Sequence, residues 1–247
     1  MNVDHVTEMA SSTWEPFAED YRRGELIEPH SHELAQLVFA KSGVMRVHTE
    51  AGAWVVPPQR ALWIPAGVMH WISCSTAVAM RTVYLEPSAV PTMAGETSVL
   101  AASALLREIV LRLVEGRPGA PAALLAVLAS EIAAVPAAPL HLPEPRDPRL
   151  RRVCARMQAD PGATDRLAEH ARAAGASVRT LIRLFQDETG LSFRAWQRRL
   201  RLLAALERLA QGQPVGTVAL DVGYGAPSAF IVAFRADLGV TPARYFG

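Results

Sequence analysis

The sequence predicts an α+β protein with two domains, a β-barrel in the N-terminal half and an all-α domain in the C-terminal half. Up to about Leu85, short apolar runs rich in β-branched and aromatic residues alternate with Gly and Pro, which is typical of an all-β barrel or sandwich. From Ser98 the apolar residues recur with helical spacing. Residues 136–148 contain five prolines, which cannot continue a helix and therefore predict an extended linker.

These observations divide the 247 residues into four segments, and each half is large enough to bury its own core. We expect a barrel over residues 1–92, a helical hairpin over 93–136, a linker over 137–147 and a helical domain over 148–247. No run approaches the roughly 20 apolar residues of a membrane span, and the N-terminus is acidic. We therefore expect a cytoplasmic protein with no membrane partner.

Five apolar runs predict the strands of the barrel. They are residues 34–40, 43–50, 53–58, 60–65 and 77–85. The stretch PHSHELAQLVF leads into the first of them, and a strand of period two places His30, His32 and Gln36 on one face. A third histidine, His70, follows a Pro–Gly turn. Three imidazoles and one amide oxygen in these positions form a candidate metal site.

Both histidine segments resemble the two motifs of the cupin family of small β-barrels. The first motif reads Gly24, five residues, His30-Ser-His32, three residues, Gln36, six residues and Gly43, and the second reads Pro65-x-Gly67-x-x-His70. The resemblance implies one divalent transition metal, Zn, Ni, Fe or Mn, held by His30, His32, His70 and the residue at position 36. Cupins carry glutamate there, and the neutral Gln36 is expected to bind metal more weakly.

The alternative is that the three histidines line a pocket that binds an organic effector, or that they bind nothing. Four large apolar side chains of the same half are candidates for lining an effector pocket. They are Phe39, Trp63, Met69 and Trp71, for which core packing is the other interpretation. Such a lining favours an apolar or aromatic small molecule.

The helical hairpin is predicted over residues 98–135, where two segments with apolar residues at i, i+3, i+4 and i+7 are each stopped by Gly or Pro. Its apolar circumference predicts a homodimer surface. The alternative is that the hairpin packs against the barrel within one chain.

The C-terminal domain contains two copies of one helix–turn–helix pattern, at residues 167–192 and 218–242. In the first copy, Thr164 is the expected N-cap of a helix over 165–174, and Ser177 caps a second helix that runs to about Thr189. The second copy has Ala226 at the equivalent cap position.

Between the copies, residues 191–211 predict one connecting helix of roughly 28 Å. This length is near the ~34 Å between successive major-groove faces on one side of DNA, so one chain can place both second helices on the same face.

The charge of the two halves differs in sign. Residues 147–247 carry 15 arginines and nine acidic residues, a net charge of +6, whereas residues 1–146 carry −5. An Arg-rich half predicts an anionic partner, with double-stranded DNA first. Helical spacing turns one set of residues outward as candidates for base contacts: Arg179, Ile182, Arg183, Ser228, Ile231 and Val232. Candidates for phosphate contacts are Ser177, Arg198, Arg199, Arg201 and Arg235, and phosphate contact is also the alternative for Arg179 and Arg183.

The segments VRTLIRLFQDETGLSFRAWQRRLRLLAALERL and VALDVGYGAPSAFIVAFRADLGVTPARYF resemble the DNA-binding domain of the AraC/XylS family of bacterial transcription regulators. The resemblance implies base contacts from the outward residues of both second helices, with Pro227 included. The family often carries glutamine where this chain has Ile182, so the base preference at that position stays open.

The expected function is therefore a sequence-specific transcription regulator, not an enzyme, whose DNA binding or activation is controlled by a small molecule or metal in the barrel. The resemblance implies promoter DNA, a small-molecule effector and, for an activator, RNA polymerase as partners. One alternative is a metal-dependent oxygenase or isomerase, which needs a general acid or base that Gln36 cannot supply. Another is an architectural DNA binder, which leaves the barrel unexplained.

Overall fold

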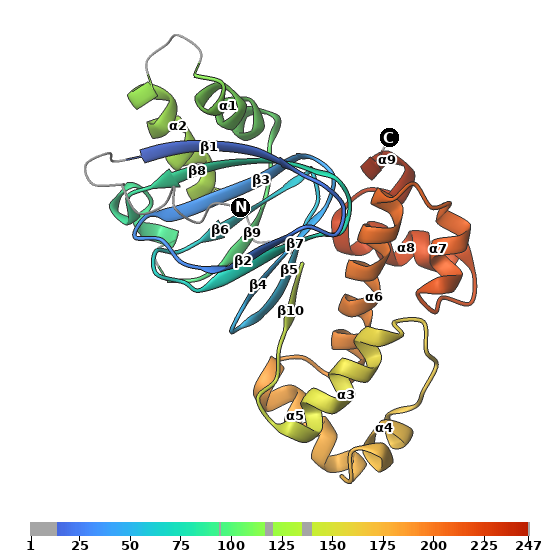
Figure 1. Cartoon of the computed structure of the whole chain (residues 1–247). Coiled ribbons are helices and arrows are strands. Elements are labelled where there is room, and N and C mark those ends of the chain that lie inside the picture. Colours follow the sequence, from blue (N-terminus) through green and yellow to red (C-terminus); the bar gives the residue numbers. More distant parts are fainter. Residues whose placement is uncertain (1–13, 94, 117–120, 135–139, 247) are drawn as a thin grey trace. The chain divides into compact units, whose positions relative to one another are not determined.

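The computed structural model describes residues 14–93, 95–116, 121–134 and 140–246 (Figure 1). The chain divides into two compact units. The first consists of Met1–Thr49 with Val56–Ala138, and the second of Glu50–Val55 with Pro139–Gly247. The second unit therefore includes a short piece of the N-terminal half in addition to the C-terminal domain.

The strands form two five-stranded sheets. One sheet has the order β1 (Trp14–Tyr21), β8 (Val78–Leu85), β3 (Ala35–Ser42), β6 (Arg60–Ile64) and β9 (Ser98–Ala101). The other has the order β10 (His141–Pro143), β5 (Gly52–Val56), β4 (Met45–Thr49), β7 (His70–Cys74) and β2 (Leu26–His30). With the helical C-terminal half, this confirms the predicted α+β class. The predicted hairpin starts later than expected, because Ser98–Ala101 pairs with β6 as a strand.

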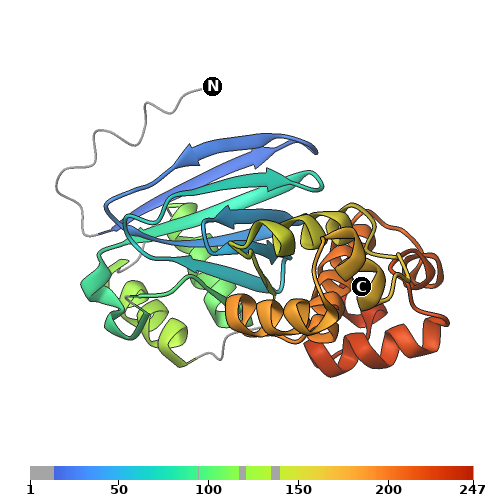
Figure 2. The same cartoon turned by 90° about the horizontal axis from the view of Figure 1, so that it is seen from below.

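Helices α1 (Ala104–Val114) and α2 (Pro121–Ala134) pack together beside the first sheet (Figures 1 and 2). The Ser103 hydroxyl caps α1 by accepting from the backbone N–H of Leu106, and it donates to the carboxylate of Glu131 on α2. One apolar core joins the helices to one face of the sheet. Its members include Leu37, Phe39, Trp63, Val83, Leu106, Ile109 and Leu128.

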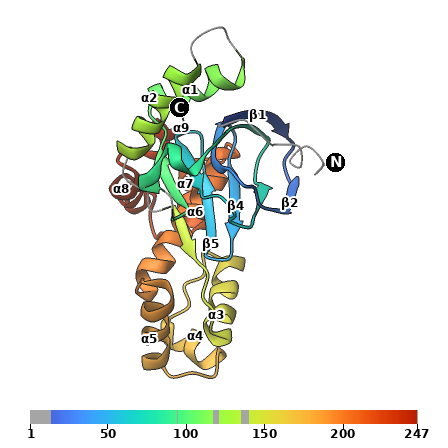
Figure 3. The same cartoon turned by 90° about the vertical axis from the view of Figure 1, so that its left-hand side faces the viewer.

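The second unit is mainly helical. Its helices are α3 (Pro148–Ala159), α4 (Leu167–Ala173), α5 (Val178–Thr189), α6 (Phe193–Ala210), α7 (Val215–Asp221), α8 (Pro227–Leu238) and α9 (Pro242–Phe246). Figure 3 shows α3, α4 and α5 grouped at one end of this unit. Two aromatic clusters fill its interior: Phe185 with Phe193 and Trp196, and Phe230 with Phe234 and Tyr245. No described helix is long and apolar enough to cross a membrane.

The two helix pairs α4–α5 and α7–α8 differ at their helix starts. The first pair begins at Leu167 rather than at the expected 165, because Arg166 occupies the N-cap position and donates its backbone N–H to Glu169. The expected caps at the second helices are present: Ser177 accepts from the N–H of Thr180, whereas Ala226 provides no side-chain cap. Both second helices end at a left-handed glycine.

Arg201 on α6 connects the loop between α3 and α4 with the turn between α7 and α8. Its guanidinium donates to the carbonyl oxygens of Pro161 (3.1 Å) and Ala163 (3.1 Å), which lie between α3 and α4. It also donates to the carbonyl of Gly223 (3.0 Å), which lies between α7 and α8. These three bonds hold the α3–α4 loop and the α7–α8 turn against α6.

The predicted linker is partly regular structure. Residues 135–139 lie outside the described residues, but His141–Pro143 form β10, which pairs with β5. The imidazole of His141 stacks on Trp54 with ring centroids 4.2 Å apart, and the indole N–H of Trp196 donates to the carbonyl of Pro143. All of these residues belong to the second unit.

Candidate functional site: a histidine cluster and an arginine-bearing helical face

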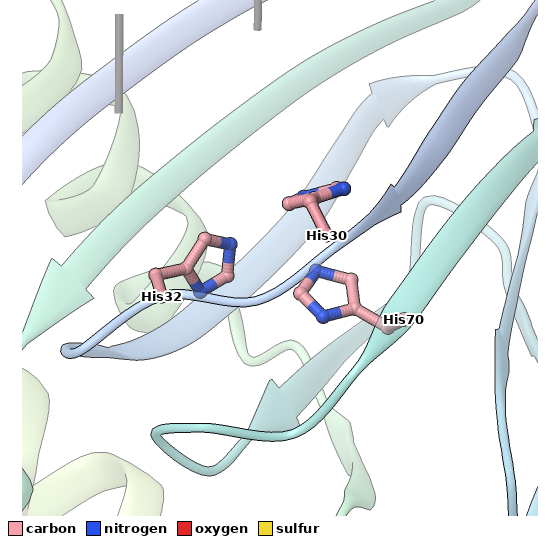
Figure 4. A group of neighbouring side chains, drawn as sticks. All are labelled: His30, His32 and His70. Atoms are coloured by element: carbon pink, nitrogen blue, oxygen red, sulfur yellow. The ribbon is translucent and has the colours of Figure 1, made fainter. Parts of the chain in front are cut away.

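Three histidines from separate parts of the first unit meet in one cluster (Figure 4). His30 ends β2, His32 lies in the turn before β3, and His70 begins β7, where it pairs with His30. Their ring centroids lie 4.4 to 5.2 Å apart, and one ligand nitrogen from each lies within 4.8 Å of the others. The single strand expected through His30, His32 and Gln36 is therefore wrong, because β2 ends at His30 and the chain bends before β3 begins at Ala35.

Hydrogen bonds set the tautomers of two of these histidines. Nδ1 of His30 lies 2.7 Å from the carbonyl oxygen of Glu28, and Nδ1 of His70 lies 2.9 Å from that of Val68. Because a carbonyl oxygen only accepts, each Nδ1 carries the proton and each Nε2 keeps a free lone pair. Metal-binding histidines in proteins are commonly held in this way.

Burial keeps the inner histidines neutral. Burial, helped by the neighbouring imidazoles, lowers the pKa of His32 to about 3. Burial also lowers the pKa of His70 to about 4, although its hydrogen bond to Val68 opposes the shift. Nε2 of both residues is buried and has no hydrogen-bond partner among the described residues. Such orphaned acceptors are costly in a folded protein unless a ligand satisfies them.

Gln36 is the fourth predicted ligand, and it contacts Tyr84, whose ring packs on His32. Its amide N–H group donates to the hydroxyls of Thr82 (3.5 Å) and Tyr84 (3.4 Å) on the neighbouring strand β8. In this orientation of the amide, the carbonyl oxygen Oε1 is buried and without a partner among the described residues. The three histidine nitrogens lie close enough together to hold a divalent transition metal, and the buried Oε1 of Gln36 is a donor atom of a kind that such metals accept.

Tyr84 is part of this cluster and has no sequence motif. Its ring meets that of His32 at 4.8 Å in an edge-on arrangement, so side chains from both sheets come together here. Burial, with a contribution from Glu15, raises the pKa of Tyr84 to about 12, so the phenol is protonated at neutral pH. Strand register provides the only signal that finds Tyr84, because it lies directly opposite Gln36.

The four residues predicted to line an effector pocket lie apart from the histidine cluster. Phe39 and Trp63 belong to the core shared with α1 and α2, on the face of the sheet opposite to Gln36. Trp71 lies next to buried His70 in β7, so it points to the other face and stacks on His48. Met69 is 47% exposed in the preceding turn. None of the four joins the histidine cluster.

On α5, the predicted base-contact residues share the solvent face. Arg179, Ile182 and Arg183 are exposed, whereas Leu181, Leu184 and Phe185 are buried. Arg183 forms a weak, exposed ion pair with Asp187 (3.4 Å). Gln186 lies on the same open face and was not predicted as a contact.

On α8, the equivalent face is almost uncharged. Pro227, Ser228 and Val232 are exposed, and Ile231 is half-buried. Arg235, one turn later, is exposed and extends this face. A groove of about 500 Å³ runs beside α8 and is lined in part by Arg194 and Arg198 of α6.

The predicted phosphate-contact residues occupy different environments. Arg198 is half-exposed and forms a two-point ion pair with Asp237 (2.7 and 3.0 Å). Arg199 is partly buried and donates to the carbonyl of His141. Arg201 has all three nitrogen positions engaged with backbone carbonyls, so its guanidinium serves the fold rather than an outside partner. Ser177 is exposed, and its hydroxyl is engaged as the α5 cap.

Comparisons with known proteins agree with this arrangement. The AraC-like ligand binding domain matches residues 17–176, and a helix-turn-helix domain matches residues 170–247. This pairing defines a transcription regulator that carries a ligand-binding domain and a helix-turn-helix DNA-binding domain. The HTH-type transcriptional regulator NimR of Escherichia coli K12 is 38% identical over 227 residues, which cover 90% of this chain and 83% of NimR. The chain belongs to the AraC family of transcription regulators, as the resemblance predicted.

Two further matches are weaker. A putative AraC-like transcription regulator of Streptomyces antibioticus is 33% identical over 100 residues, which cover 40% of this chain and 33% of that protein. Among solved structures, the match to ToxT of Vibrio cholerae covers 95% of this chain and 98% of the ToxT chain, with 10% identity and a TM-score of 0.41. Because this score is low, the family assignment rests on the sequence matches.

Proposed function

We propose that this AraC-family regulator binds promoter DNA sequence-specifically and that occupancy of the histidine cluster by a divalent transition metal controls DNA binding or activation. The observation that carries the proposal is the convergence of buried, partnerless Nε2 atoms from His32 and His70 beside His30. The cluster lies in the domain that matches the AraC-like ligand binding domain. A bound metal would supply a positive charge and fixed coordination geometry, and these residues would hold it.

The two helix pairs are the proposed DNA readers. On α5, Arg179 and Arg183 can donate to guanine edges, because both are exposed and the ion pair of Arg183 with Asp187 is long, at 3.4 Å. On α8, Val232 is 70% exposed and suits an apolar contact with a thymine methyl group. We propose that most hydrogen-bonded readout comes from α5, with Ile182, Pro227, Ser228 and Ile231 adding shape and apolar contact. The exposed arginines Arg198 and Arg235 are the proposed phosphate contacts, with Arg199 nearby.

A homodimer and, for an activator, contact with RNA polymerase complete the proposal. The hairpin of α1 and α2 leaves Leu105 51% exposed and Val127 43% exposed, while the rest of its apolar residues pack largely on the sheet. Exposed apolar side chains on neighbouring helices favour a self-association surface. The molecular mass in solution, measured by sedimentation, tests the dimer.

The first experiment measures metal content and DNA affinity together. We would purify untagged protein without chelator, determine its metals by elemental analysis, and enrich bound DNA from a random-sequence pool. We expect about one metal per chain in the wild type, loss of metal in His32→Ala, and a change of roughly 5–150-fold in affinity for the enriched DNA on metal removal. His48→Ala is the matched control, because His48 stacks on Trp71 outside the cluster.

Two results would contradict parts of the proposal separately. Wild-type protein without metal, even after incubation with Zn²⁺, Ni²⁺, Fe²⁺ or Mn²⁺, would reject the metal site and leave the histidines as candidates for an organic-ligand pocket. Equal affinity for enriched and scrambled DNA would reject sequence-specific binding.

A further inference from the structure

We propose that the effector of this regulator is a small anion that binds directly to the metal in the histidine cluster and accepts a hydrogen bond from the hydroxyl of Tyr84. This inference rests on the proposed metal site and adds the chemical class of the ligand. It concerns the charge of the cluster, the open coordination positions and one polar side chain beside them.

The donor set of the cluster carries no negative charge. His30, His32 and His70 form the cluster, and within the described residues no Asp, Glu or Cys joins it within the same ligand distance. The remaining donor, Gln36, is neutral in place of a carboxylate. A divalent ion held by these four atoms keeps a full charge of +2.

Burial makes this uncompensated charge costly. His70 is fully buried, His32 is 6% exposed and Gln36 is 1% exposed, so water solvates the ion poorly from their sides. A buried charge is stabilised by a paired opposite charge and is unfavourable without one. The site therefore favours an anion over a neutral ligand of the same shape.

The number of protein donors would leave room for such a ligand. The four donors would occupy four positions of a bound ion, and Ni²⁺, Fe²⁺ and Mn²⁺ commonly take six ligands. Water would occupy the other positions, and an anion would replace it in a ligand exchange that changes no oxidation state. His30 is the least buried ligand of the cluster, which places the accessible side of the metal near β2.

Tyr84 provides the hydrogen bond to the anion. Its oxygen accepts from the amide of Gln36, so the phenolic proton is not used in that bond. Among the described residues none accepts this proton in a hydrogen bond, and the ring lies against His32. The hydroxyl therefore lies beside the metal ligands with one donor available.

Glu15 carries a negative charge close to Tyr84. It lies directly across from Tyr84 in the pairing of β1 with β8 and influences that phenol electrostatically. Its carboxylate is outside the ligand cluster. The preference for an anion therefore depends on the metal charge, which attracts it, and on Glu15, which repels it. A negative charge introduced at position 36 lowers this preference.

The test uses full-length protein loaded with Co²⁺, whose visible absorption reports changes in its ligands. Acetate and acetamide are the probes, because they have nearly the same shape and differ by one charge. We expect acetate to change the cobalt spectrum with saturation and acetamide to leave it unchanged. Gln36→Glu should retain cobalt and weaken acetate binding by about tenfold or more, because it supplies the missing negative charge.

Tyr84→Phe separates the hydrogen bond from the charge. We expect this variant to retain cobalt and to bind acetate several-fold more weakly. Thr82→Val, which removes the other hydrogen-bond partner of Gln36, is the control and should change the acetate affinity less.

Equal responses to acetate and acetamide, or unchanged acetate affinity in Gln36→Glu, would overturn the inference while leaving the metal site intact. Failure of the wild type to bind cobalt would overturn the metal site and this inference together. An intact cobalt response with no effect of acetate on DNA affinity would reject an anion as the effector.

Discussion

At the scale of single residues, Gln36 determines the charge of the proposed metal site. We expect Gln36→Glu to tighten Zn²⁺ or Ni²⁺ binding by about tenfold, because a carboxylate compensates part of the ion's charge where an amide does not. Competition with a chromophoric chelator measures the affinity. Gln36→Met, which removes the oxygen and keeps the length, should weaken binding. If all three proteins bind metal equally, position 36 is not a ligand.

Arg183 tests whether α5 reads bases. We expect Arg183→Ala to cost about 1–3 kcal/mol on the preferred DNA and to relax specificity at one base position, because a bidentate arginine–guanine contact would be lost. Fluorescence anisotropy on preferred and single-base-changed DNA measures both. Asp187→Ala, which removes only the exposed ion-pair partner of Arg183, is the control. An equal loss on random DNA would assign Arg183 to the phosphate backbone instead.

At the scale of elements, the turn between α7 and α8 depends on glycine at position 223. This residue has φ +83°, and a Cβ there would lie 2.7 Å from Nη2 of Arg201 and 2.8 Å from the carbonyl oxygen of Gly162. We expect Gly223→Ala to lower the free energy of unfolding by about 1–3 kcal/mol. Urea denaturation of the full chain measures it.

Gly175, in the turn between α4 and α5, provides the matched control. It also has a positive φ, +65°, but a Cβ there would meet nothing within 4 Å. Gly175→Ala should therefore cost only the backbone strain, roughly 1–2 kcal/mol, and less than Gly223→Ala. If the two substitutions cost the same, Arg201 does not crowd the second turn.

The elements also show where sequence reasoning succeeds. Helical periodicity and caps predicted α5 nearly to the residue, because Ser177 and Gly190 mark its two ends chemically. The strand through His30 and His32 was wrong, since period two cannot distinguish a continuous strand from two strands joined by a bend. Phe39 and Trp71 lie apart from the cluster for a different reason. Phe39 is three residues after Gln36 and Trp71 is one residue after His70, so period two already places each on the opposite face of its strand.

At the scale of the whole molecule, buried neutral histidines make stability depend on pH. The folded protein holds the pKa of His32 near 3 and those of His70 and His48 near 4, all by burial, against 6.5 for an exposed histidine. The unfolded chain therefore binds more protons between these values, so stability is full above about pH 6.5 and falls as the pH drops toward 4. We expect the melting temperature of metal-free protein to fall from pH 7 to pH 5.

Differential scanning calorimetry at both pH values measures this loss. His48→Asn lies outside the metal cluster and should reduce the pH dependence without removing it, because the buried His32, His70 and His170 remain. A melting temperature that is flat between pH 7 and pH 5 would show that these imidazoles are not kept neutral by the fold.

The domain organisation was more predictable than the contacts that hold it. The five prolines within residues 136–148 marked the change from the hairpin to the helical domain, but no pattern predicted that His141–Pro143 would pair with β5. Likewise, Arg201 looks like any other arginine of a basic helix in the sequence, and only its three carbonyl partners reveal a structural role. Pairings between residues far apart in the chain carry no local signal.

The length of α6 has a consequence for how this protein's binding sites can change in evolution. Its 18 residues span about 27 Å, and Arg201 fixes the α3–α4 loop and the α7–α8 turn to it. One inserted residue would turn the second pair by about 100° about the helix axis and direct it away from the DNA face served by the first. Under the proposed mode of binding, the length of α6 fixes the distance between the two DNA-contacting helices, α5 and α8. New target sites would then arise by substitutions on α5 and α8, while the distance between the two recognised segments stays constant.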